Sequence, residues 1–187
     1  MDLDDLKLQT VYALKTKPRD WKVDKNAPKV RLEGEFGSEQ NKLRGDVYRY
    51  AHARLAEASE LGMHFEVIAL CDMMITDILE ALCQHLLKEE DLQFETMSSN
   101  QALSALEVAI KDNRRELNSS VEWKDLRKSL REFFNGRNAC LHSFVLIKNA
   151  ASDVTLKQRV EFLEATSEDG IKLLNAVGQF TARERQR

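Results

Sequence analysis

Proline is nearly missing from this sequence, and its placement divides the chain. Only two of the 187 residues are proline, Pro18 and Pro28, and two of the seven glycines, Gly34 and Gly37, follow closely. Beyond them the chain lacks the residue that most strongly breaks helices. We therefore predict an irregular N-terminal arm at residues 1–38 and a helical domain at residues 39–187. Within the arm, apolar pieces at 11–14 and 30–32 are candidate strands.

Long hydrophobic runs are also missing. The most apolar stretch, residues 65–87, is interrupted by Asp72, Asp77 and Glu80, and the chain begins Met-Asp-Leu-Asp-Asp. Neither segment has the pattern of a membrane span or of a signal peptide. We expect a cytoplasmic protein that does not enter membranes.

Cysteine is scarce, and the charge is nearly balanced. The three cysteines (Cys71, Cys83 and Cys140) have no metal-ligand spacing, and three of the four histidines (His52, His64 and His85) have no companions at such spacing. We predict reduced structural thiols, no metal and no cofactor. A net charge of −3 gives no general attraction to nucleic acid, so any RNA site must be a local basic patch.

What the sequence does contain is helical periodicity, which predicts an all-α bundle of about five helices. The first covers residues 39–61 and ends at Gly62, a candidate left-handed cap. Its apolar stripe is predicted at Leu43, Val47, Tyr50, Arg54, Ala58 and Leu61. The second, residues 64–88, is apolar over about half its circumference, so it is either the central helix or a dimer face.

Capping boxes predict where two further helices begin. One is opened by Ser98 with Gln101, and the other by Ser119 with Glu122. The latter leads to Asn135-Gly136, which we interpret as a break before a separate motif helix. Residues 153–185 form one or two closing helices, broken or kinked near 167–170.

The motif helix begins Arg137-Asn138-Ala139-Cys140-Leu141-His142. Histidine can move a proton near neutral pH and arginine is a permanent cation, and these two groups suffice to cleave RNA without a metal. In a regular helix the two residues lie roughly 140° apart around the axis and about 7.5 Å along it. Either the break at Asn135-Gly136 redirects Arg137, or a second copy of the chain completes the site. Asn138 shares the face of His142.

This stretch resembles the Arg-x4-6-His motif of HEPN domains (higher eukaryotes and prokaryotes nucleotide-binding), in which a polar residue, often Asn, follows the arginine. The resemblance extends more loosely over residues 40–150. It implies a homodimeric helical bundle with the motifs facing across a cleft. In many members it also implies an endoribonuclease or RNase toxin, with Arg137, Asn138 and His142 as catalytic residues and RNA as the substrate.

The resemblance also suggests how the activity of such a toxin is controlled. Toxins of this family that are paired with a nucleotidyltransferase antitoxin often carry a modifiable tyrosine two residues after the histidine. The residue here is Phe144, which has no hydroxyl to modify. An antitoxin partner of that kind would have to act differently on this chain.

Two other functions remain open. The mannitol-repressor family has a similar Arg-Asn-x-x-x-His-Ser pattern, matched here at Arg137, Asn138, His142 and Ser143, and a comparable stretch at Asp77–Glu80. Its usual Pro-Leu-Gly is replaced by Gln-Ala-Leu at 101–103. A regulator without catalysis is therefore one alternative. A nucleotide- or partner-binding helical module is the other.

Several nearby residues have two interpretations each. Asp72, at the edge of an apolar face, is a natural partner for Arg137, either as a structural ion pair or as a group that orients the arginine for catalysis. The basic residues Lys124, Arg127, Lys128 and Arg131 form either an RNA-binding track or an ordinary solvated face. Cys140 is predicted to be a packed thiol.

Overall fold

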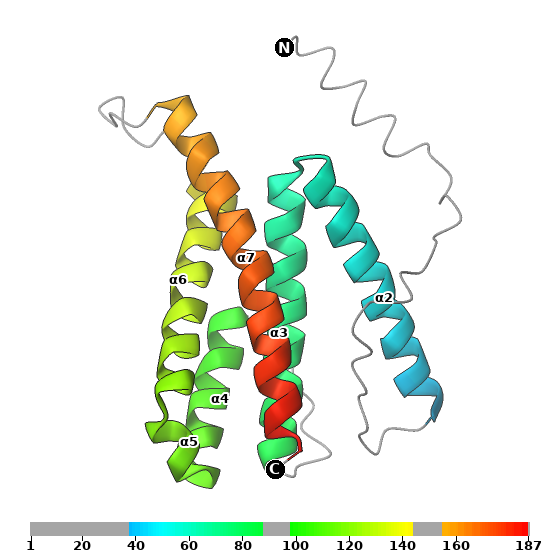
Figure 1. Ribbon diagram of the computed structural model, residues 1–187, viewed down its shortest axis with the longest axis vertical. Helices are drawn as coiled ribbons and strands as arrows, with labels where there is room; N and C mark the ends of the chain where they lie inside the picture. Colours follow the sequence, from blue (N-terminus) through cyan, green and yellow to red (C-terminus); the bar gives the residue numbers. More distant parts are fainter. Residues whose placement is uncertain (1–37, 88–97, 144–154, 187) are drawn as a thin grey trace. The chain divides into compact units, whose positions relative to one another are not determined.

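Six α-helices make up the part of the chain that the computed structural model describes, namely residues 38–87, 98–143 and 155–186 (Figure 1). Side chains are described from residue 45, and those of 142 and 143 are not. The helices are α2 (Ser38–Glu60), α3 (His64–Leu87), α4 (Ser99–Asn113), α5 (Arg115–Ser119), α6 (Val121–Ser143) and α7 (Leu156–Glu184). The all-α prediction is confirmed for these residues. Apart from Ser38, which begins α2, the predicted arm and its candidate strands lie outside them.

Helix α3 is the central helix of the bundle. It contacts α2, α4, α6 and α7, with α2 on one side and α4 and α6 on the other in Figure 1. Val67, Ile68, Cys71, Ile75 and Leu82 on α3 are almost completely buried. Four neighbours account for its wide apolar circumference, so the first of the two interpretations of residues 64–88 is confirmed.

The predicted stripe of α2 is correct at Ala58 and wrong at Val47, Tyr50 and Leu61, which are exposed. Val47 and Tyr50 are 56% and 58% exposed, whereas Leu55 and Ala58 are buried and Tyr48 packs beside them. Helix α2 contacts only α3 among the described helices, so a narrow stripe is enough to hold it. Polar contacts then set its rotation. The Tyr48 hydroxyl donates to Asp77, and Arg54 Nε lies 2.6 Å from Glu66 Oε1.

Most of the predicted helix boundaries are correct. Gly62 has a φ of 67° and ends α2 in the left-handed conformation, as expected. Ser98 and Gln101 form the predicted capping box at the start of α4. The start of α6 is shifted by one residue, because Ser120 and not Ser119 accepts a hydrogen bond from the backbone N–H of Trp123.

Neither predicted break in the last two helices exists. Helix α6 continues through Asn135-Gly136, and α7 continues through residues 167–170. Gly170 instead permits close packing, because a Cβ at this position would lie 2.8 Å from Phe133 Cε2 and 3.3 Å from Cys71 Cβ. The glycine that suggested a kink is therefore a point where α7 packs closely against both α3 and α6.

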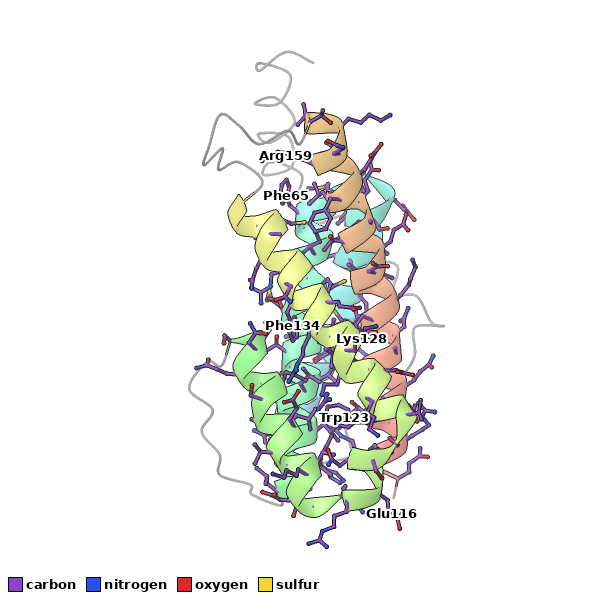
Figure 2. All side chains as sticks on the ribbon, turned by 90° about the vertical axis from the view of Figure 1, so that its left-hand side faces the viewer. Phe65, Glu116, Trp123, Lys128, Phe134 and Arg159 are labelled. Atoms are coloured by element: carbon purple, nitrogen blue, oxygen red, sulfur yellow. The ribbon has the colours of Figure 1, made fainter. Side chains whose placement is uncertain are left out.

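Helices α6 and α7 run antiparallel. A Cβ at Gly136 would meet Thr166, while nearer the opposite end Trp123 stacks on Phe180 with ring centroids 5.7 Å apart. Figure 2 shows Phe65 and Arg159 at one end of the bundle and Glu116 of α5 at the other. Among the described helices, none has the length and apolar character needed to cross a membrane.

Candidate functional site

Arg137 lies at a junction of three helices. Its Nη2 is 3.1 Å from Asp72 Oδ1 on α3 and donates a 2.9 Å hydrogen bond to Ser99 Oγ on α4. Ser99 Oγ in turn donates to Asp72 Oδ1 at 2.7 Å. The predicted contact between Asp72 and Arg137 is thus present, and we call these three residues the arginine junction.

The arginine junction is largely screened from solvent. The side chains of Arg137 and Asp72 are 15% and 18% exposed, and Ser99 is 4% exposed. The guanidinium carbon of Arg137 also lies 6.0 Å from the centre of the Phe134 ring. Charged hydrogen bonds are strengthened where water is scarce, so the guanidinium is held in a fixed position.

One atom of the arginine remains unsatisfied. Arg137 Nε is buried and has no hydrogen-bond partner within the described part of the chain. Both polar contacts of the junction use Nη2. The protein therefore holds the guanidinium by one of its terminal nitrogens.

Ser99 was not predicted from the sequence. The available signal was indirect: the capping box at Ser98 makes Ser99 the first residue of α4, and helix N-termini often contribute polar groups to neighbouring charges. Nothing in the local sequence indicates that the start of α4 meets the middle of α3.

The motif histidine is placed only by the backbone. Residue 142 lies in α6, five residues after Arg137, and its side chain is outside the described set. Because α6 is continuous, the idea that a break redirects Arg137 is wrong. A regular helix separates the two positions by roughly 140° around the axis. A single copy of α6 therefore directs these two positions to different sides.

The other motif residues have ordinary environments. Asn138 is half-buried, and Cys140 is a buried free thiol. Burial raises the pKa of the Cys140 thiol, and a hydrogen bond with Thr166 acts in the opposite direction. Burial, with the nearby charge of Asp72, raises the pKa of Cys71 to about 12. Both thiols are therefore protonated at neutral pH and are poor nucleophiles.

The four predicted RNA-binding residues do not behave alike. Arg131 Nη2 lies 2.7 Å and 3.0 Å from the two carboxylate oxygens of Glu107 on α4, and Arg127 Nε lies 3.9 Å from the same group. Lys124 is exposed, and Lys128 is exposed with Glu132 3.8 Å away. The two arginines thus connect α6 to α4 through Glu107. The two lysines are exposed to solvent.

Among the described residues, no group of three or more His, Cys, Asp or Glu side chains is arranged to hold a metal ion. In comparisons with known proteins, the chain matches no family model, and no curated protein or solved structure is significantly similar to it.

Proposed function

We propose that this chain is a cytoplasmic endoribonuclease that acts as a homodimer, without a metal, and makes 2′,3′-cyclic phosphate ends. The 2′-oxygen loses its proton and bonds to phosphorus while the bond from phosphorus to the 5′-oxygen breaks and that oxygen is protonated, with His142 as the general base or the general acid. Arg137 steadies the charge on the phosphate, and Asn138 positions it. Its role is that of a toxin or of a defence RNase, and in the first case an antitoxin protein controls it. Phe144 indicates that the control is not by modification of that side chain.

The arginine junction is the observation that carries the proposal. Electrostatic catalysis is most effective when the stabilising charge is already fixed before the reaction. Asp72 and Ser99 hold Arg137 in this way from two other helices, within 3.1 Å. Asp72 then acts as a positioning residue and does not touch the RNA.

The continuity of α6 supports a site made by two chains. One helix presents positions 137 and 142 on different sides. Two copies of α6 related by a twofold axis can bring Arg137 of one chain near residue 142 of the other, because such an interface repeats each contact. Lys124 and Lys128 then contribute affinity for phosphate without selecting a sequence.

One observation favours a second candidate, a regulator without catalysis. Arg137 is only 15% exposed and already neutralises a carboxylate. Removing one partner of such a pair costs about 3–5 kcal/mol, which is reason enough for the arginine to be present. In that case the motif stabilises the bundle, and function lies on another surface.

The deciding experiment measures RNA cleavage and thermal midpoint on the same preparations, with excess EDTA. We expect His142→Ala to reduce cleavage by about 10²–10⁴-fold with little change in midpoint. His85→Ala is the matched control, because His85 is an exposed histidine near the end of α3. It should cleave like the wild type.

Asp72→Asn tests whether Asp72 positions Arg137 for catalysis or only stabilises the fold. It keeps the shape of the side chain and an acceptor for Ser99, but removes the charge that holds Arg137. If Asp72 positions Arg137, the variant loses cleavage even when it is assayed well below its thermal midpoint, where it is still folded. If the wild-type dimer leaves both structured and single-stranded RNA intact, the nuclease proposal is wrong and the regulator is favoured.

A further inference from the structure

The outer surface of α6 has two edges of opposite charge. The edge toward α4 carries Arg127 and Arg131, which contact Glu107. The edge toward α7 carries Glu122, Asp125 and Glu132, which line a groove between α6 and α7. The spacing of three and seven residues places these carboxylates along one side of the helix. The side facing α7 is therefore the acidic one.

The α6–α7 groove has a volume of about 740 Å³ and an apolar floor. Its apolar lining includes Leu126, Phe133, Phe162, Leu173 and Phe180. Phe162 is 49% exposed, whereas the other four side chains are buried and form the floor beneath it. The small residues Ser129, Gly136 and Ala176 also line the groove and leave room above the floor.

The rim of the groove is acidic on balance. Four carboxylates line it, from Glu122, Asp125, Glu132 and Asp169, against the two cations Lys172 and Arg183. Three of these carboxylates already contact cations: Glu122 pairs with Arg183, Asp169 lies 3.4 Å from Lys172 Nζ, and Glu132 lies 3.8 Å from Lys128 Nζ beside the groove. All three pairs are exposed to water and therefore weak, and Asp125 adds a further negative charge. The remaining charge repels phosphate and attracts cationic groups.

We propose that the α6–α7 groove binds a basic amphipathic helix of a partner protein. The apolar face of that helix covers Phe162 and the floor, and its flanking lysines or arginines meet Asp125 and Glu132 on one rim and Asp169 on the other. This is the helix-in-groove mode, in which apolar anchors supply affinity and charges select the partner. The inference does not depend on the ribonuclease proposal, because neither Arg137 nor Asn138 lines the groove.

The test uses the full chain and a fluorescent designed peptide of about 18 residues, five helical turns, made of leucine and lysine with a leucine stripe at i, i+3, i+4 and i+7. We expect saturable binding by anisotropy that weakens as salt is raised. A peptide of the same composition in scrambled order is the peptide control and should bind much more weakly. Equal binding of both peptides would overturn the proposal, since it would show attraction to charge alone.

Two protein variants locate the binding. Asp125→Lys with Glu132→Lys should weaken binding by roughly tenfold or more, because a rim attraction becomes a repulsion. Asp112→Lys with Glu116→Lys is the matched control, since both acids are exposed on α4 and α5 outside the groove. It should bind within about twofold of the wild type. Equal losses in both double variants would reject the groove as the site.

A third variant, Ala176→Trp, fills the groove at an exposed position. We expect lost binding with an unchanged thermal midpoint. Two further outcomes would also overturn the proposal. If the Asp125→Lys, Glu132→Lys variant changes the mass in sedimentation, the groove is covered by a second copy. If a labelled RNA oligonucleotide binds the wild type but not Ala176→Trp, the groove belongs to nucleic acid.

Discussion

At the scale of single residues, Arg137 connects three helices through one nitrogen. Its ion pair with Asp72 is mostly buried, and Ser99 joins the same contact from α4. A pair of this kind differs physically from the exposed pair between Arg49 and Asp46 on α2, where both side chains are at least half exposed. Water screens the second pair and not the first.

We expect Arg137→Ala to lower the free energy of unfolding by about 3–5 kcal/mol, because it leaves the Asp72 carboxylate buried without a cation. Arg49→Ala makes the same change in the exposed pair and should cost less than about 1 kcal/mol. Urea titrations followed by circular dichroism measure both. Similar costs in the two variants would show that the arginine junction contributes no special stability.

At the scale of helices, the glycines of α7 have different roles. Gly170 is buried where a Cβ would meet Phe133 and Cys71, whereas a Cβ at Gly178 would meet no described atom within 4 Å. Both lie inside a continuous helix, where glycine is less favourable than alanine by roughly 1 kcal/mol. The two glycines therefore differ only in how closely neighbouring helices pack against them.

Gly170→Ala should destabilise the protein by about 1–3 kcal/mol, because the added methyl forces Phe133 or the α7 backbone to move. Gly178→Ala, the matched control, should stabilise it by about 0.5–1 kcal/mol through helix propensity. Thermal midpoints of the two variants should thus shift in opposite directions. A shift of the same sign in both would mean that α7 does not approach Phe133 this closely.

The helices also show what the sequence could and could not reveal. Apolar periodicity and capping residues located α2, α3 and α4, because those signals are local. The rotation of α2 was missed because Tyr48 and Arg54 settle it through contacts with α3. The glycines were misread because a local rule cannot distinguish a helix break from a close approach. Glu107, the partner of two arginines, carries no local signal.

The candidate site was partly predictable for the same reason. A carboxylate at the edge of an apolar face requires a cation, and this rule correctly paired Asp72 with Arg137. Ser99 could not be deduced, because its place depends on how α4 crosses α3. The orientation of Arg137 relative to residue 142 depended on whether α6 was broken, and the helix is continuous.

At the scale of the whole molecule, the question is how many chains make one site. The wide apolar surface of α3 is covered by four helices and no longer argues for a dimer. The remaining argument is geometric, since a continuous α6 separates positions 137 and 142. The prediction of a homodimer therefore stands on the motif alone.

We expect sedimentation at micromolar concentration to give twice the chain mass of 21.5 kDa. We also expect an equal mixture of His142→Ala chains and Arg137→Gln chains to recover about a quarter of the wild-type cleavage, because about half of the dimers are mixed and each mixed dimer contains one intact composite site of two. A site within one chain predicts no recovery in the mixture. A monomer at these concentrations would exclude the two-chain site altogether.

The arginine junction also has a consequence for how the chain is made. Its contacts join residues separated by 27 and 38 positions, so it depends on non-local closure and not on any one helix. During synthesis Asp72 and Ser99 emerge well before Arg137 and have no cation from α6 until that helix is complete. The arginine proposed to act on RNA therefore joins the junction after Asp72 and Ser99 have been made, while α7 is still to follow. We expect a chain truncated before residue 137 to have a destabilised core, because Asp72 is left without its cation, and therefore to be prone to degradation.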